Sequence, residues 1–156
     1  MGGKAYIRRV ETAECIEQSP HPGYESKRRI IVGKEDSENF GVSVYEVPPG
    51  KSAVPYHYHL RNEEVFFIMR GTGRLKSPEG EKTVIAGDFL YFPNNESGAH
   101  KLTNISQAEP LVYADFDILH ALEVAVYPDS DKVGIFGMGR RMIFPADKQT
   151  DYFDGE

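Results

Sequence analysis

Residues 50–71 read GKSAVPYHYHLRNEEVFFIMRG, and this stretch carries most of what the sequence predicts. In an extended chain, side chains two residues apart point to the same face. His57 and His59 are therefore expected to lie side by side on one strand, with Tyr58 on its opposite face. Glu64 opens the apolar run that follows, so a short loop returns a carboxylate toward the two imidazoles. This arrangement predicts a metal-chelating site.

The strand that begins at Glu64 supports this interpretation through its alternation. Phe66 and Ile68 share the face of Glu64, so the carboxylate is expected to point into an apolar interior. A buried carboxylate is costly unless a cation or hydrogen bonds satisfy it. A bound metal ion would supply that cation.

Most of the remaining chain has the pattern of short β-strands separated by turns. β-Branched and aromatic residues concentrate in seven runs, at 29–32, 40–47, 64–69, 83–85, 89–92, 111–116 and 122–127. Turn residues separate them, as in Pro48-Pro49-Gly50 and Ala86-Gly87-Asp88. Short strands at near-regular spacing predict an all-β sandwich or barrel.

Three segments outside these runs have weaker patterns. Residues Ala5–Arg9, together with Arg28–Val32, are expected to extend one sheet. Residues Ala13–Gln18 are expected to form one short helix. Residues 142–156 lose the strand pattern and end in DYFDGE, which predicts a C-terminal tail.

The composition favours one soluble domain over residues 1–156. The chain has 40% apolar and 27% charged residues, and its net charge of -6 argues against binding to nucleic acid or to an anionic membrane surface. The single cysteine, Cys15, has no partner for an internal disulfide, which suits a reducing compartment. The first ten residues show no apolar signal segment. We therefore expect a cytoplasmic protein.

The stretch from residue 50 to residue 71 resembles the first sequence signature of the cupin superfamily. In that signature a glycine precedes His-x-His, a glutamate follows, and a second glycine closes the motif. Gly50, His57, His59, Glu64 and Gly71 match it. The spacing to the last glycine selects Glu64 rather than the residue before it. The match departs from the signature in one place, because six residues, rather than the usual five, separate Gly50 from His57.

A second cupin signature follows downstream. Gly87, Pro93, His100 and Asn104 match its positions, although the interval from the proline to the histidine is about two residues longer than usual. The two signatures stand in the family's order and cover about residues 40–117, the expected barrel core. The resemblance implies a double-stranded β-helix, also called a jelly roll.

The resemblance also implies a metal centre. The matching positions assign His57, His59, Glu64 and His100 as ligands of one divalent transition metal ion per chain. Three imidazoles and one carboxylate suit Mn, Fe, Zn, Ni, Co or Cu better than Ca or Mg, which prefer oxygen ligands. The sequence leaves the identity of the ion open.

The function is less constrained than the fold. The chain looks like small, uncharacterised bacterial cupins described as sugar-phosphate isomerases, which implies a metal-dependent isomerase or epimerase acting on a sugar or sugar phosphate. An iron-dependent dioxygenase is one alternative, and a non-catalytic module that binds or senses a small molecule is another. Arg61 and Arg70 are candidate contacts for a phosphate group, and Tyr45 and Tyr91 are candidates to line a cavity. No residue is assigned as the catalytic acid or base.

The expected partners are a small-molecule ligand and a second copy of the chain. Val65, Phe67 and Met69 point away from the face of Glu64, and an outward apolar row needs a partner sheet or a covering tail. Small cupins commonly pair through their sheets. A homodimer is therefore expected, with neither nucleic acid nor membrane as a partner.

Overall fold

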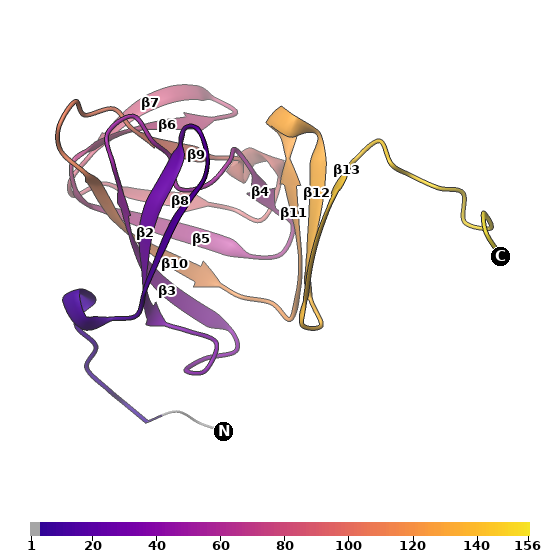
Figure 1. The fold of residues 1–156 in the computed structure, drawn as a ribbon, viewed down its shortest axis with the longest axis horizontal. Coiled ribbons are helices and arrows are strands. Elements are labelled where there is room, and N and C mark those ends of the chain that lie inside the picture. Colours follow the sequence, from indigo (N-terminus) through magenta and orange to yellow (C-terminus); the bar gives the residue numbers. More distant parts are fainter. Residues whose placement is uncertain (1–3) are drawn as a thin grey trace.

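The computed structural model describes residues 4–156, so residues 1–3 of the predicted domain lie outside the described residues. Short β-strands dominate, with three single-turn 3-10 helices between them (Figure 1). The first seven strands are β1 (Cys15–His21), β2 (Tyr24–Val32), β3 (Phe40–Val47), β4 (Tyr58–His59), β5 (Glu63–Arg70), β6 (Thr72–Ser77) and β7 (Gly80–Ile85). The later strands are β8 (Phe89–Phe92), β9 (Lys101–Asn104), β10 (Leu111–Ile118), β11 (Leu122–Tyr127), β12 (Lys132–Gly137) and β13 (Arg140–Pro145). The 3-10 helices are η1 (Val10–Thr12), η2 (Glu96–Gly98) and η3 (Pro128–Ser130).

The strands form three antiparallel sheets. The largest has the order β1-β2-β3-β10-β5-β8, a second has the order β7-β6-β9, and the third has the order β13-β12-β11-β4. Neighbours such as β3 and β10 are far apart in sequence, as a jelly roll requires. The predicted all-β, antiparallel fold is confirmed.

The core lies between the six-stranded and the three-stranded sheets. On β5, the burial alternates along the strand, and Phe66 and Ile68 are buried as the sequence predicts. The residues that pack with them come from both sheets and are Tyr45, Val47, Ala53, Val84, Phe92, Leu102, Leu111 and Tyr113. One apolar core therefore fills the barrel, except near Glu64, where the interior becomes polar.

The N-terminal region differs from the sequence expectation. Residues Ala13–Gln18 do not form a helix, because Cys15–His21 pairs as an edge strand with β2. All seven residues of this strand are exposed, so its pairing rather than a buried apolar face defines it. Residues Ala5–Arg9 are not a strand, whereas Arg28–Val32 lies in β2 and extends the sheet beside β3.

The C-terminal region also differs. The expected tail from residue 142 begins inside β13, because Met142 and Ile143 pair with β12. The chain beyond β13 extends away from the barrel (Figure 1), and Tyr152 and Phe153 are exposed. Over residues 4–156, no helix combines the length and the apolar character needed to cross a bilayer.

Candidate metal centre

Backbone pairing brings the two signature motifs together. His59 lies in β4 and Glu64 opens the buried face of β5. The backbone of His57 pairs with that of His100 through two N–H to carbonyl hydrogen bonds of 3.1 and 2.9 Å. Residues 43 positions apart in sequence therefore hold their imidazoles side by side, with ring centroids 4.7 Å apart.

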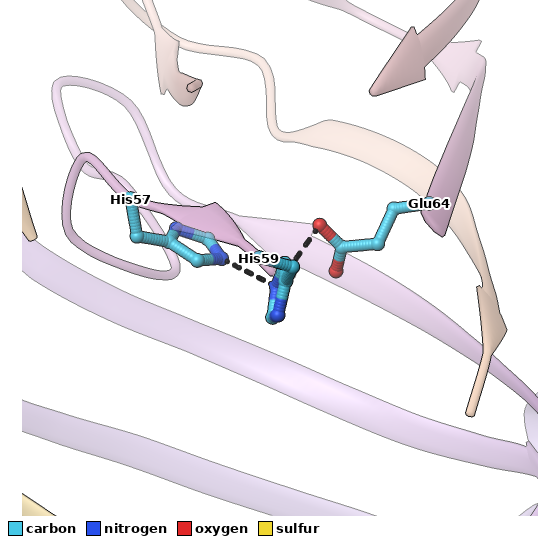
Figure 2. A group of neighbouring side chains, drawn as sticks. All are labelled: His57, His59 and Glu64. Carbon is cyan, nitrogen blue, oxygen red and sulfur yellow. Dashed lines mark hydrogen bonds and ion pairs between the residues drawn. The ribbon is translucent and has the colours of Figure 1, made fainter. Parts of the chain in front are cut away.

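The ligand atoms of His57, His59 and Glu64 lie within 4.8 Å of one another, and His100 approaches the same carboxylate. The Nε2 atoms of His57 and His59 are 3.1 Å apart, and the Nε2 of His59 lies 3.3 Å from Oε2 of Glu64 (Figure 2). The Nε2 of His100 lies 3.3 Å from the same oxygen. Glu64 and His100 are buried. His59 is more accessible, with 16% of its side chain exposed.

The hydrogen bonds of two imidazoles leave the converging nitrogens free to bind a metal ion. The Nδ1 atoms of His57 and His100 donate to the backbone carbonyls of Pro55 and Gly98, each at 2.9 Å. A neutral imidazole that donates from Nδ1 keeps a lone pair on Nε2. The Nε2 of His100 and Oε2 of Glu64 are buried and have no hydrogen-bond partner among the described residues. Buried polar atoms without partners are rare and indicate a missing ligand or ion.

The spacing of the ligand atoms of His57, His59 and Glu64 fits one ion. With metal–ligand bonds of about 2.1 Å, neighbouring ligand atoms lie about 3.0 Å apart in an octahedral site and about 3.4 Å apart in a tetrahedral site. The separations of 3.1 and 3.3 Å within this group fall in that range, and His100 stands beside it with its Nε2 3.3 Å from the same oxygen of Glu64. The donor set of three nitrogens and one oxygen suits a transition metal.

The electrostatics of the metal-free site follow from burial and from the neighbouring charges. Burial lowers the pKa of His57 and lowers that of His100 to about 4, so both imidazoles are neutral at neutral pH. Burial opposes charging of His59, but Glu123 and Glu64 raise its pKa to about 10. Burial acts to raise the pKa of Glu64, but the facing imidazoles hold it well below its usual value. Without metal, one proton therefore resides on His59.

Glu123 is a further carboxylate at the site, and sequence reasoning missed it. It lies on β11, which pairs with β4, and its Oε1 is 3.6 Å from Nδ1 of His59. Its carboxylate also accepts the backbone N–H groups of Leu60, Arg61 and Asn62, in the loop between the ligands. Glu123 is thus positioned to hold both the second imidazole and the loop that leads to Glu64.

Asp115 and Asp117 form a second acidic group beside Glu64. Each of the three residues offers an oxygen within 4.8 Å of the other two, and Asp117 is the register partner of Glu64 across β10 and β5. Burial and the neighbouring carboxylates raise the pKa of Asp115 well above its ordinary value and that of Asp117 to about 7. Sequence reasoning missed this group. The signal that could have found it is the alternation of Asp115 and Asp117 at the end of an apolar strand.

The four candidate substrate contacts are dispersed. Tyr45 lies in the core, where its ring stacks on that of Tyr113 at 5.2 Å between centroids. Tyr91 is 60% exposed and donates a hydrogen bond to Glu63 on the outer face of the sheet. The structure also leaves Arg61 and Arg70 exposed, at opposite ends of the segment from β4 to β5.

Arg28, unlike Arg61 and Arg70, lies on the inner face of the six-stranded sheet. It is the register partner of Tyr45, and its guanidinium lies 5.7 Å from the centroid of that ring. Its Nε donates to the hydroxyl of Ser43 at 2.9 Å. Sequence reasoning missed Arg28 because its inward orientation depends on how β2 pairs with β3.

Comparisons with known proteins agree with this geometry. Residues 43–118 match the family model described as Cupin domain. The structure resembles that of a sugar phosphate isomerase from a cupin superfamily from Silicibacter pomeroyi, with a TM-score of 0.83 and 21% identity over 96% of this chain and 98% of that chain. A proposed sugar phosphate isomerase from Acidithiobacillus ferrooxidans gives a TM-score of 0.77 and 21% identity, covering 91% of each chain.

Other solved structures share the fold over a smaller part of the chain. A predicted oxalate decarboxylase from Thermotoga maritima gives a TM-score of 0.64 and 21% identity, covering 74% of this chain and 100% of that chain. At these identities the likeness concerns the fold. A search of curated protein sequences found no match.

Proposed function

Since this chain belongs to the cupin superfamily, we propose that His57, His59, Glu64 and His100 hold one divalent transition metal ion, of Mn, Fe, Zn, Ni, Co or Cu. The support is the convergence of their ligand atoms and the buried, unpartnered Nε2 and Oε2 atoms. A metal ion held there would polarise a carbonyl or hydroxyl oxygen of a substrate. The two backbone carbonyls that accept from His57 and His100 orient these imidazoles before the ion binds.

We further propose that the protein is an isomerase or epimerase acting on a sugar or sugar phosphate. The single observation that carries this proposal is the carboxyl group of Asp117 beside the ligand Glu64, within 4.8 Å. Isomerisation of a hydroxy-carbonyl compound needs a group that removes a proton from one carbon and returns it to its neighbour. Asp117, on the strand beside Glu64, is placed to do this for a substrate bound at the centre.

Two nearby residues support this assignment. Glu64 is committed to the imidazoles through Oε2, so it is a poor proton carrier. Glu123 is buried and occupied by three backbone N–H groups. Asp117 is half-buried beside Glu64, and burial and that carboxylate raise its pKa to about 7, which suits a group that takes up and returns a proton.

The test is turnover in heavy water by the metal-loaded protein. Aldose and ketose phosphates of five and six carbons are incubated with protein loaded separately with Mn, Fe, Zn, Ni, Co or Cu, and NMR records the product and any deuterium incorporated at carbon. We expect interconversion that is lost in His59→Ala and falls at least a hundredfold in Asp117→Asn. The matched control is Glu46→Gln, an exposed carboxylate on β3.

The same experiment distinguishes the alternatives. Oxygen consumption by the iron-loaded protein without isomerisation would replace the proposal with a dioxygenase. Ligand binding without turnover would replace it with a binding or sensing module. Unchanged turnover in Asp117→Asn would remove Asp117 from the reaction.

We also propose that the protein is a homodimer. On the outer face of β5 and β8, Met69, Phe89 and Tyr91 are 43%, 70% and 60% exposed, and the rings of Phe67 and Phe89 lie 4.5 Å apart. The C-terminal tail extends away and leaves its own aromatic residues exposed, so it does not cover this face. A second copy of the chain is the occupant that the apolar face favours.

A further inference from the structure

Asp115 has an oxygen atom that no group in the protein satisfies. Its side chain is on the inner face of β10, where its register partners are Ser43 on β3 and Phe66 on β5. The residue is 5% exposed, and its Oδ1 has no hydrogen-bond partner among the described residues. A buried carboxyl oxygen without a partner is costly to fold, so it indicates a group that arrives from outside the chain.

Arg28 provides a complementary charge on the same face. Among residues 4–156, its guanidinium has one hydrogen-bond partner, the hydroxyl of Ser43, reached through Nε. Both Nη groups are therefore available, and a guanidinium with two free Nη groups suits a phosphate or carboxylate. Because Ser43 on β3 is the register partner of Asp115 and accepts from Arg28, the arginine and the unpartnered carboxyl group lie on the two strands that flank β3.

Aromatic rings share the inner face of the sheet with these polar groups. The rings of Tyr45 and Tyr113 are stacked, and the ring of Phe66 lies 4.8 Å from that of Tyr113. Small-molecule sites generally combine apolar walls with a few convergent polar groups. Carboxyl groups, an arginine and aromatic faces together suit a molecule with hydroxyl groups, an anionic end and C–H surfaces.

We propose that Asp115 and Arg28 form a ligand subsite beside the metal centre that takes a polyhydroxylated anion, either a sugar phosphate or a sugar acid. A hydroxyl group of the ligand forms a hydrogen bond with Asp115, and the anionic group binds the Nη atoms of Arg28. The proposal deepens the proposed function, on which it rests, by assigning how the two ends of the substrate are held.

The alternative occupant is a second cation held by Glu64, Asp115 and Asp117. Two observations disfavour it. Oε2 of Glu64 already faces the imidazoles of His59 and His100. The free guanidinium of Arg28 is close enough to influence both aspartates and would repel a cation there.

The test measures ligand binding and metal content together. Calorimetry on manganese-loaded protein compares fructose 6-phosphate, galacturonate, the uncharged polyol sorbitol and inorganic phosphate, and elemental analysis gives the metal count. We expect the two anionic sugars to bind at least tenfold more tightly than sorbitol or phosphate. The tighter of the two shows whether the anionic group of the ligand is a phosphate or a carboxylate.

Two variants test which end of the ligand each residue binds. Asp115→Asn keeps the shape of the side chain and is expected to weaken the anionic sugars at least tenfold. Arg28→Gln is expected to weaken them similarly while leaving sorbitol unchanged. Glu46→Gln and Lys27→Gln, both at exposed positions of the same sheet, are the matched controls. If Asp115→Asn does not fold, as judged by circular dichroism, Arg28→Gln provides the test.

Each outcome decides between the proposals. Wild-type affinity in both variants would overturn the subsite while leaving the proposed function intact if turnover is present. Weaker binding in the variants, without turnover by any metal-loaded form, would support the subsite and count against the isomerase. Two manganese ions per wild-type chain and one in Asp115→Asn would assign the acidic group to a second cation and overturn the proposal. No binding by any of the four probes would overturn it as well.

Discussion

Glu123 provides the sharpest test of how the metal centre is held, through the substitution Glu123→Gln. Oε2 accepts the N–H of Asn62, whereas Oε1 accepts the N–H groups of Leu60 and Arg61 and faces Nδ1 of His59 at 3.6 Å. A glutamine that keeps its oxygen toward Asn62 turns its NH₂ group toward these donors. The variant therefore loses the negative partner of His59 while the side chain keeps its volume.

The expected effect on metal affinity follows from this loss. Substituting a residue that supports a metal-binding histidine typically costs about 10–100-fold in affinity, or about 1.4–2.7 kcal/mol. We expect this loss for zinc, measured by competition with a chromophoric chelator at pH 7.5. Glu46→Gln, an exposed carboxylate on β3, is the control and should bind zinc like the wild type.

The expected effect on stability is tested by Glu123→Ala in the metal-free protein. The N–H of Leu60 also donates to the carbonyl of Val124 and keeps that partner, and Arg61 is exposed to water. Asn62 is buried, so its N–H loses its acceptor at a cost of about 1–3 kcal/mol. A loss of about 2 kcal/mol lowers Tm by about 4–8 °C in a chain of this length.

The result that would refute the role of Glu123 comes from the zinc measurement. It is a zinc affinity of Glu123→Gln within threefold of that of the wild type.

Three further predictions concern the ligands, their protons and the outer face. His57→Ala and Glu64→Ala should each remove the metal ion from purified protein, and a stoichiometric ion retained in either variant would contradict the assigned ligands. Because the pKa of His59 is raised to about 10, it is protonated at pH 7.5, and binding of the ion should release about one proton. Calorimetry in two buffers of different ionisation enthalpy measures this release, and a buffer-independent enthalpy would exclude it. Phe89→Asp should convert the dimer into a monomer in light scattering with its metal content unchanged, whereas a wild type with the mass of one chain would exclude the dimer.

The parts of the fold that sequence predicts well are those controlled by local alternation. The face shared by Glu64, Phe66 and Ile68 follows from a two-residue period, and the structure buries all three. The grouping of His57, His59 and Glu64 follows from the same period and one short loop. These relations need no knowledge of how distant strands pair.

The relations that sequence reasoning missed depend on distant pairing. Glu123 reaches His59 because β11 pairs with β4, more than sixty residues earlier in the chain. Arg28 lies on the inner face because β2 pairs with β3. The strand at Cys15–His21 has no buried face that could reveal it, and its pairing with β2 overrides the local pattern that suggested a helix.

The imidazoles of the candidate centre differ in the origin of their support, and this affects how such a site can change over evolution. His57 and His100 are oriented by backbone carbonyl groups two residues earlier in their own segments, so their support does not depend on another side chain. His59 is instead supported by β11, which lies beyond the matched residues 43–118. Mutations in the β11–β13 segment can therefore adjust the basicity of one ligand while the other imidazoles stay fixed. In this chain, the properties of the candidate centre can therefore change without a change in His57, His59, Glu64 or His100.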